Sequence, residues 1–431
     1  MIIKKNKSGL PLQVEYCKKC NLSNQQPTTV NEYFHTKDTI QTTVEFDQNG
    51  ICAACNFNKK KWDNTIDWNL REKELIDLCN KFRKKDGSYD CIVGGSGGKD
   101  SIFASYMLKY KYKMNPITVT WSPHMYTDIG WQNMQNWIHE GGFDNFLYTP
   151  NGKVHRLLTK NATKNLLHPF QPFIMGQKTF VVKMALRLNI PLVFYGEMPG
   201  EYGKKMSHEL NRFGTKEGNE SQKGFEMNPS NGKNFKEVYL GGKQVQEYID
   251  EGIQLNDLES YKPADPNLIN EKKINFHFLG YYLRWVPQEN YYFAVDKINF
   301  KSNPERTEGT YQKYASIDDK IDGFFYYTKY IKFGVGRAMK DSGQEIRNGH
   351  ITKEEGISLI EKFDGEYPTT YEKEFYEYIG MEKNQFIELC DTFRPPHIWK
   401  KNKNKWDYVI SPKEYFANKL KSEEENYTNQ L

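Results

Sequence analysis

A run of five residues with four glycines, 94–98, constrains the fold of this chain more than any other sequence feature. It follows a short apolar segment, 91–93, that predicts a buried strand, and it precedes a stretch that predicts a helix beginning near Lys99. Glycine lets the backbone turn with positive φ and approach a ligand closely. The unpaired N–H groups and the positive dipole end of the helix then point into the loop. The sequence therefore predicts an anion site, suited to a phosphate group.

The polar residues of the loop suit a phosphorylated ligand as well. Ser96 and Ser101 can donate hydroxyl hydrogen bonds to phosphate oxygens. Lys99 adds a positive charge, and Asp100 can help to hold a magnesium ion. The spacing differs from GxxxxGK[ST], which excludes the Walker loop of ordinary kinases and GTPases. It also differs from GxGxxG followed by an acidic ribose ligand.

Apolar runs alternate with helix-like stretches over residues 67–197, which predicts a parallel sheet with right-handed crossovers. The expected strands cover residues 91–93, 117–121, 146–148 and 191–195, and the expected helices cover 67–85, 102–108 and 176–188. Glu197 follows the last of these strands at its carboxyl end, where ligands bind in open α/β sheets. Its alternative role is to cap the next turn. We therefore expect an α/β core with its ligand site at the carboxyl ends of the strands.

Four of the seven cysteines form two close pairs, Cys17-x-x-Cys20 and Cys52-x-x-Cys55. Residues 46–50 resemble a hairpin turn just before the second pair. Two such knuckles can place four thiolates at the corners of a tetrahedron, the geometry that Zn²⁺ accepts. A site closed by four cysteines leaves no position for a substrate, so we expect a structural zinc ion in a ribbon-like knuckle unit over residues 1–66. An iron–sulfur cluster or four unrelated buried cysteines are the alternatives.

The rest of the chain differs in character from the core. Residues 198–272 are rich in Gly, Asn, Lys and Glu, and they predict a polar insertion or lid. Aromatic residues return densely after Ile274, and Thr352-Lys-Glu-Glu355 predicts a capping box that opens a helix. We expect a helical, substrate-binding region over residues 273–421 and a frayed polar tail over 422–431.

Composition bears on the location and partners of the chain. The formal charge of +5, from 60 basic and 55 acidic residues, gives no support for nucleic-acid binding. No stretch approaches the roughly 18 consecutive apolar residues of a membrane helix, and residues 1–8 lack the apolar core of a secretory signal. An odd cysteine total with two close pairs favours metal binding in a reducing compartment. These features predict a cytoplasmic protein without a membrane partner.

The loop Ser96-Gly-Gly-Lys-Asp-Ser101 resembles the SGGxDS signature of the PP-loop ATP pyrophosphatase superfamily, whose fold is adenine nucleotide alpha hydrolase-like. Its members transfer AMP from ATP to a carbonyl or amide-type oxygen, release pyrophosphate, and let a nitrogen or sulfur nucleophile displace AMP. The resemblance implies ATP and Mg²⁺ as ligands, with Lys99, Asp100 and Glu197 as catalytic residues. The implied ATP-binding residues are Gly95, Ser96, Gly97, Gly98, Lys99, Asp100, Ser101 and Gly196.

Further motifs are similar to those of the N-acetyl sugar amidotransferases that serve pseudaminic acid, legionaminic acid and O-antigen synthesis. The two cysteine pairs, residues 46–50 and Tyr195-Gly-Glu197 resemble the N-terminal and core patterns of that family. Its C-terminal signature resembles residues 309–311, 316–319, 322–323, 332–337, 345–349 and 364–366.

This C-terminal signature implies a sugar pocket. The implied substrate-binding residues are Asp318, Asp319, Asp322, Lys332, Arg337, Glu345 and Arg347. Lys332 and Arg337 could hold a carboxylate or phosphate on the sugar, and the three aspartates could accept hydroxyl hydrogen bonds or bind magnesium. The alternative for each residue is a solvated helix face with intramolecular ion pairs.

The implied reaction converts a sugar acetamido group to an acetamidino group, in bacterial surface-glycan (lipopolysaccharide) or flagellin sugar biosynthesis. AMP transfer to the amide oxygen creates a leaving group that ammonia displaces. Neither Cys79 nor Cys91 stands in the context of a glutaminase nucleophile. The resemblance therefore implies separate glutaminase and ammonia-channelling subunits, similar to those of histidine biosynthesis.

A PP-loop tRNA-thiolating enzyme is the main alternative, and a catalytically silent zinc-binding scaffold is another. Thiolating enzymes generally need cysteines after the loop to handle sulfur, whereas here only Cys390 lies beyond Cys91. Stimulation of nucleotide turnover by an acetamido sugar and not by tRNA would discard the thiolation alternative.

Overall fold

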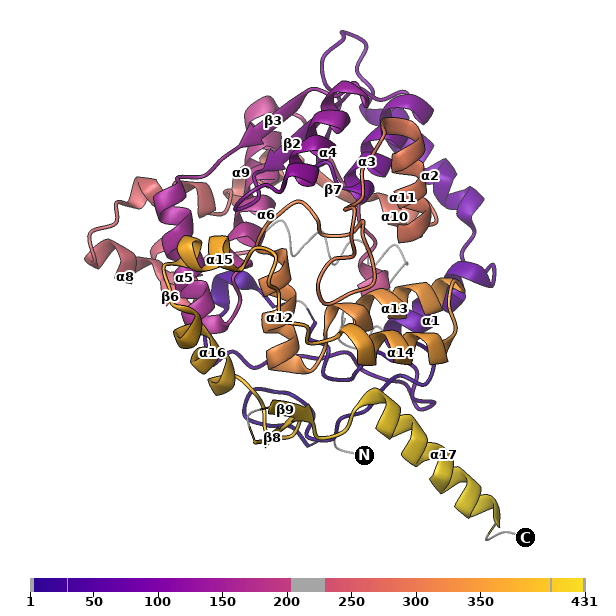
Figure 1. Ribbon diagram of the computed structural model, residues 1–431. Helices are drawn as coiled ribbons and strands as arrows, with labels where there is room; N and C mark the ends of the chain where they lie inside the picture. The colour runs from indigo at the N-terminus through magenta and orange to yellow at the C-terminus, as the bar shows by residue number, and fades with distance from the viewer. Residues whose placement is uncertain (1–3, 29, 203–228, 404, 429–431) are drawn as a thin grey trace.

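The computed structural model describes residues 4–28, 30–202, 229–403 and 405–428. Its centre is a five-stranded parallel sheet with strand order β3-β2-β1-β4-β7 (Figure 1). The strands are β1 (Cys91–Gly94), β2 (Pro116–Trp121), β3 (Asn145–Tyr148), β4 (Leu192–Tyr195) and β7 (Asn275–Phe278). The first four confirm the strands expected from the apolar runs. The fifth, β7, lies within the region expected to be helical. It is a strand because Asn275–Phe278 pairs with β4, which lies about eighty residues earlier in the chain.

Helices cover both faces of the sheet, because successive strand side chains point to opposite sides. Ile92 and Val193 pack on α5 (Gly152–Leu166) and α6 (Gln171–Leu188). Val93 and Phe194 pack on the other face against α2 (Trp68–Phe82) and α3 (Lys99–Tyr106). A π-helical turn, η2 (Met107–Lys111), continues α3, and α4 (Asp128–His139), α10 (Leu279–Tyr282) and α11 (Pro287–Ile298) complete this part. The result is a mixed α/β fold with three layers.

Residues 229–272 contribute to the core, which differs from the polar insertion or lid expected over residues 198–272. Residues 203–228 lie outside the described residues, so that part of the expectation is not addressed. The segment forms η4 (Phe235–Glu237), β5 (Tyr239–Leu240), β6 (Lys243–Gln244), α8 (Val245–Asp250), η5 (Leu255–Tyr261) and α9 (Pro266–Glu271). Its apolar side chains are separated by polar residues along the chain, yet Tyr248 and Tyr261 are buried in the cluster formed by α5, α6 and the sheet. Scattered apolar residues thus gather only in three dimensions.

The N-terminal residues 4–66 contain little regular structure beyond η1 (Glu32–Phe34) and α1 (Ala53–Trp62). The expected turn before the second cysteine pair is confirmed: Asp47 accepts hydrogen bonds from the N–H groups of Asn49 and Ile51 at 2.8 and 3.0 Å. Gly50 completes the turn with a φ of +74°. This segment packs on both the core and the C-terminal helices, since Tyr33 donates to the Tyr261 carbonyl at 2.6 Å and Asn21 donates to the Lys353 carbonyl at 2.9 Å.

The C-terminal region is mainly helical and lies below the sheet in the view of Figure 1. It comprises α12 (Asp322–Phe333), α13 (Arg337–Asn348), α14 (Lys353–Phe363), α15 (Glu372–Ile379), α16 (Lys383–Thr392), the hairpin β8 (Trp399–Asn402) and β9 (Lys405–Tyr408), and α17 (Pro412–Thr428). The capping box at Thr352 and Glu355 is confirmed. The helix α17 projects from the body and includes most of the tail expected to fray. Within the described parts of the chain, no helix combines the length and apolarity needed to span a membrane.

Candidate nucleotide pocket and cysteine centre

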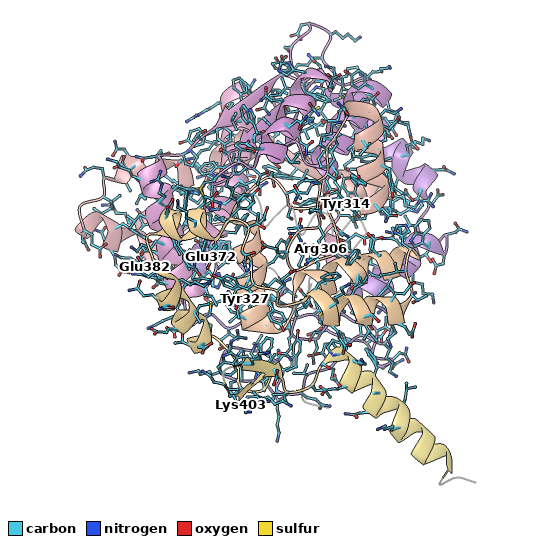
Figure 2. All side chains as sticks on the ribbon, in the orientation of Figure 1. Arg306, Tyr314, Tyr327, Glu372, Glu382 and Lys403 are labelled. Atoms are coloured by element: carbon cyan, nitrogen blue, oxygen red, sulfur yellow. The ribbon has the colours of Figure 1, made fainter. Side chains whose placement is uncertain are left out.

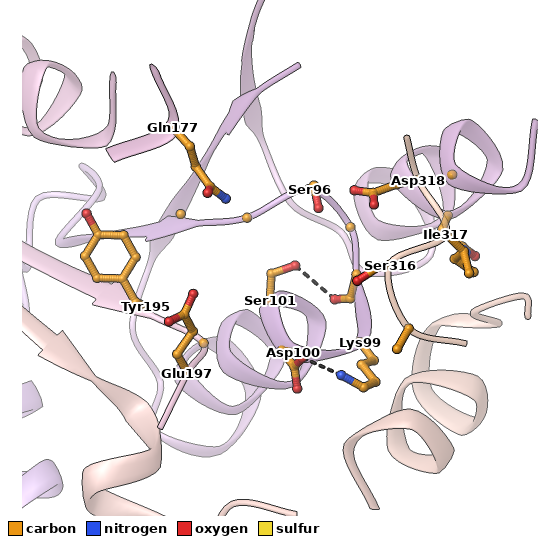
Figure 3. A pocket seen from close by; sticks show the side chains of 18 of the residues that line it. Ser96, Lys99, Asp100, Ser101, Gln177, Tyr195, Glu197, Ser316, Ile317 and Asp318 are labelled. Carbon is orange, nitrogen blue, oxygen red and sulfur yellow. Dashed lines mark hydrogen bonds and ion pairs between the residues drawn. The ribbon is translucent and has the colours of Figure 1, made fainter. Parts of the chain in front are cut away.

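A cavity of about 280 Å³ lies beside the carboxyl ends of β1 and β4 (Figure 3). The glycine loop, the first turn of α3, residues 195–197 and the connection between α11 and α12 form much of its wall. All the residues expected to bind ATP line it, and so does Glu197. Parallel strands end at the same edge of a sheet, which is why segments a hundred residues apart meet here.

The glycine loop is shaped by close packing. The Gly95 N–H group donates to the Val119 carbonyl at 3.0 Å, which ties the loop to the neighbouring strand. A Cβ atom on Gly95 would lie 2.2 Å from the Cβ of Ser101, so no side chain fits there. Gly97 has a φ of +78°, the left-handed conformation that glycine adopts without strain. The helix α3 begins at Lys99, directly after Gly98, and its first N–H groups therefore face the cavity side of the loop.

The charged residues at the start of α3 are paired with each other. Lys99 Nζ lies 2.5 Å from Asp100 Oδ2, and Asn290 donates to Asp100 Oδ1 at 3.1 Å. The Ser101 hydroxyl donates to the Gly98 carbonyl at 2.9 Å. Lys99 thus carries its positive charge at the wall of the cavity, while both carboxylate oxygens of Asp100 already have partners.

The three predicted aspartates have different surroundings. Asp318 lines the cavity and faces Ser96 (Figure 3); burial raises its pKa, as does nearby Asp319, although a hydrogen bond with Ser96 opposes the rise. Asp319 is buried and holds His124, accepting from its backbone N–H group and contacting Nδ1, both at 2.7 Å. Asp322 is also buried, and burial together with Asp318 raises its pKa well above the ordinary value. Of the three, Asp318 is the one on the cavity wall.

Two further predicted substrate residues lie behind that wall. Arg337 is 2% exposed, donates to the Ala315 carbonyl, and places its guanidinium 4.5 Å from the centre of the Tyr326 ring. Glu345 accepts a hydrogen bond from the Tyr314 hydroxyl at 3.2 Å. Since Tyr314 and Ala315 both line the cavity, these residues support the wall rather than face the space.

The segment between α11 and α12, which forms this part of the cavity wall, is held in place by contacts with other parts of the chain. Figure 2 shows Arg306 and Tyr314 on the segment that joins α11 to α12. Arg306 forms two hydrogen bonds of 2.6 Å with the carboxylate of Glu366, and Asn133 donates to the Lys301 carbonyl at 2.8 Å. A fork-shaped pair of this kind sets orientation as well as distance.

Lys332 and Arg347 are away from the cavity. Lys332 donates to the Leu166 carbonyl at 2.8 Å and borders a separate cavity of about 100 Å³; burial lowers its pKa to about 8. Arg347 donates to the Glu201 carbonyl at 2.9 Å. Burial opposes the charge of Arg347, yet the neighbouring Cys20 and Cys55 sulfurs raise its pKa. The structure therefore does not bring the seven predicted substrate residues together at one surface.

Sequence reasoning missed the contribution of α6 to the cavity. Gln177 and Lys178 line the cavity from this helix, and Figure 3 shows Gln177 on the same side as Tyr195. Gly176 allows the helix to approach β2, because a Cβ there would lie 2.2 Å from the Trp121 ring. The available signal was a short polar interruption in an otherwise apolar helix.

The two cysteine pairs meet at a single point. Cys17 and Cys55 have sulfur atoms 3.9 Å apart, those of Cys20 and Cys52 are 3.6 Å apart, and all four lie within 4.8 Å of one another. Zinc–sulfur bonds of about 2.3 Å in a tetrahedron require sulfur separations of about 3.8 Å. The hydrogen bond with Cys20 lowers the pKa of the Cys17 thiol, whereas the one with Cys17 raises that of Cys55. The residues present fit a bound zinc ion.

Backbone and charged groups complete this cysteine centre. The N–H groups of Lys19 and Cys52 point at the Cys17 sulfur at 3.5 and 3.3 Å, contacts that would stabilise a thiolate ligand. Four thiolates with one Zn²⁺ carry a net charge of −2, and the nearby Arg347 guanidinium offsets part of it. This gives Arg347 a role at the cysteine centre.

The C-terminal part of the chain is similar to a family of lipopolysaccharide-biosynthesis proteins. Residues 308–413 match the family model described as "LPS biosynthesis protein WbpG-like, C-terminal domain". A stretch of 93 residues is 33% identical to an uncharacterized protein, MJ1599, of Methanocaldococcus jannaschii, covering 20% of this chain and 29% of that protein. The WbpG-like match covers about a quarter of the chain. This part of the chain is therefore similar to a lipopolysaccharide-biosynthesis protein family, which suggests a role in glycan biosynthesis.

Proposed function

We propose that the protein is an ATP-dependent amidotransferase that converts the acetamido group of a sugar to an acetamidino group. One observation carries the proposal: the glycine loop and the WbpG-like segment both line one cavity. Ser96 belongs to the loop, whereas Tyr314 and Asp318 belong to the segment matched by the glycan-biosynthesis family. A site built from both would bring a nucleotide and a sugar into contact.

In the proposed reaction the amide oxygen of the sugar attacks the α-phosphorus of ATP. A phosphorus–oxygen bond forms, the bond to the β-phosphate oxygen breaks, and pyrophosphate leaves. Ammonia then adds to the activated carbon and AMP leaves with the former amide oxygen, so that C=O becomes C=NH. Adenylation is needed because an amide carbonyl is a poor electrophile.

The residues of the cavity suit the charges that develop. Loop N–H groups, the Ser96 hydroxyl and the Lys99 ammonium would stabilise negative charge on the phosphates, which is electrostatic rather than covalent catalysis. A bound Mg²⁺ would neutralise part of the triphosphate charge. Glu197, across the cavity from Ser96 in Figure 3, would take up a proton released as ammonia adds.

The remaining cysteines are poor candidates for releasing ammonia from glutamine. Cys79, Cys91 and Cys390 are all buried. Burial raises the pKa of Cys79 and of Cys390 to about 12, and it raises that of Cys91 as well. A glutaminase needs a reactive thiolate. The proposal therefore includes separate glutaminase and ammonia-channelling subunits.

The experiment combines the purified protein with MgATP, an ammonium salt and a panel of acetamido sugars. We expect a product about 1 Da lighter than its sugar, with one AMP released per product. A Ser96→Ala variant should lose most activity, whereas Lys373→Ala, at a site whose side chain is 84% exposed, should retain it. AMP release that requires tRNA, without any sugar product, would replace the proposal with tRNA thiolation.

A further inference from the structure

An aromatic side chain of the WbpG-like segment lines the nucleotide cavity. Tyr314 is half-buried there, on the connection between α11 and α12 (Figure 2). Its ring stacks on that of Tyr291 in α11, with the ring centres 4.2 Å apart and the planes inclined by 11°. One face of the Tyr314 ring is therefore covered by a different element of the fold.

The hydroxyl end of Tyr314 is fixed as well. It donates to Glu345 at 3.2 Å. Burial raises the pKa of Tyr314, and the nearby Glu345 adds to the effect, so the hydroxyl keeps its proton and remains a donor. Glu345 is itself buried, accepts from Gln312 Nε2 at 3.4 Å and contacts His350 Nδ1. With one face stacked and its hydroxyl bound, Tyr314 presents apolar ring surface to the cavity in a fixed orientation.

Polar groups accompany this ring surface on the same segment. Ser316 and Asp318 line the same cavity; the Ser316 hydroxyl lies 2.9 Å from that of Tyr326, and Asp318 faces Ser96 (Figure 3). Aromatic surface beside a few fixed polar groups is the usual composition of a small-molecule site. A pyranose ring matches it, because C–H groups gather on one of its faces while hydroxyls lie around its rim. The electron-rich face of a tyrosine attracts such C–H groups.

A nucleobase also stacks on aromatic rings, but the cavity offers it a different place. Val181 and Tyr195 line the cavity from α6 and from the end of β4, and Figure 3 shows Tyr195 and Ser316 at different sides of the pocket. Tyr314 instead belongs to the segment matched by the glycan-biosynthesis family. The position of Tyr314 therefore favours a sugar over a base.

We propose that the Tyr314 ring is the platform on which the sugar ring of the substrate lies, and that Glu345 is a positioning residue that acts through the Tyr314 hydroxyl. This inference rests on the proposed function, in that it takes an acetamido sugar as the second ligand of the cavity. It also gives Glu345, which was expected to bind substrate directly, a role that fits its place behind the cavity wall.

The test measures two affinities of the full chain. Saturation-transfer NMR follows binding of N-acetylglucosamine, UDP-N-acetylglucosamine and N-acetylneuraminate, and calorimetry follows binding of MgATP. Tyr314→Leu should bind the sugar about tenfold more weakly, whereas Tyr314→Phe, which keeps the ring, should stay within about threefold of wild type. Both variants should keep the wild-type affinity for MgATP, which also shows that they are folded. Tyr292→Leu, next to Tyr291 and 62% exposed, is the matched control and should bind both ligands as wild type does.

The role of Glu345 is tested in two backgrounds. Glu345→Leu should weaken sugar binding about fivefold in the wild type, because a buried hydroxyl is left without its acceptor. In Tyr314→Phe, where that hydroxyl is absent, the same substitution should cause no further loss. Equal losses in both backgrounds would overturn the positioning role.

The remaining outcomes separate this inference from the proposed function. A Tyr314→Leu protein with wild-type affinity for the sugar would overturn the platform, and a loss of MgATP affinity in its place would put the nucleobase on Tyr314. Wild-type protein that binds MgATP but none of the three sugars would overturn the sugar side of the proposed function, and this inference with it.

Discussion

His155 is a buried imidazole that does not readily take up a second proton. Its side chain is 2% exposed, its Nδ1 lies 2.6 Å from the Tyr261 hydroxyl, and the centre of the His124 ring is 4.7 Å from that of its own. Burial holds the pKa of His155 well below its ordinary value, and His124 adds to the effect. The folded state therefore keeps this ring neutral at a pH where the unfolded chain is protonated.

This difference predicts a pH-dependent stability. A base with a depressed pKa in the folded state contributes stability above its unfolded pKa of about 6.5 and loses it as the pH falls. We expect the urea unfolding free energy of His155→Gln to fall less than that of wild type between pH 7 and pH 5, by about 2 kcal/mol. The exposed His139→Gln is the control. Parallel profiles for His155→Gln and wild type would show that His155 is not the titrating group.

The strand–loop–helix unit of β1 and α3 depends on glycines for its geometry. Gly95 in the loop and Gly196 directly after β4 both approach the start of α3 closely. An added Cβ would lie 2.2 Å from Ser101 Cβ at Gly95 and 2.5 Å from the Asp100 carbonyl oxygen at Gly196. A side chain at either position would displace the first turn of α3. The element is thus built around the place where a phosphate would bind.

We expect Gly95→Ala to weaken MgATP binding at least tenfold, which corresponds to about 1.4 kcal/mol. The added methyl group must displace Ser101 and with it the N–H groups at the start of α3. Gly152→Ala is the matched control, because the nearest atom to its Cβ would be 4.0 Å away at the start of α5. Calorimetric binding and thermal unfolding should both be measured. Unchanged affinity in a folded Gly95→Ala protein would argue against this loop as the nucleotide site.

The cysteine centre is connected to both halves of the whole molecule through buried charges. Lys61 lies in α1, the helix that also contains Cys55. Its side chain is 1% exposed, and its ammonium contacts Glu201, the Trp285 carbonyl and Asn348 at 2.7, 2.9 and 2.8 Å. Glu201 lies four residues after Glu197, and its carbonyl accepts from Arg347. Loss of the metal or of a cysteine would therefore affect the position of the segment after β4 and of α13.

Metal removal is expected to destabilise the whole molecule and not the N-terminal segment alone. Metal analysis should find one zinc ion per chain, and chelation should lower the melting temperature by at least about 5 °C, because metal binding free energy is folding free energy. A Cys17→Ser variant should melt at the lower temperature and show no further shift with chelator. Iron with visible absorbance would indicate a cluster, and no bound metal with an unchanged melting temperature would refute a structural ion.

Features that depend on neighbours in the chain were predictable. The apolar runs of β1 to β4, the glycine loop, the capping box at Thr352 and the spacing of the cysteine pairs each act within about ten residues, so their patterns are visible in the sequence. Each Cys-x-x-Cys pair converges locally, but the metal geometry also needs the two pairs to meet, since the closest sulfur atoms belong to Cys17 and Cys55 and to Cys20 and Cys52. These features account for the first four sheet strands, the glycine loop and the two cysteine pairs.

Features that depend on where distant segments meet were not predictable. Nothing in the neighbouring sequence distinguishes Asp318, which lines the cavity, from Asp319, which holds His124. Lys332 and Arg347 have the charge of substrate ligands, but the structure pairs both with backbone carbonyl groups away from the cavity. The strand β7 and the core residues of 229–272 are equally inconspicuous, because their apolar side chains are few and separated by polar ones. A side chain's role at these positions is set by chain topology: the sheet order brings the segments together, and packing then decides which residue faces the cavity.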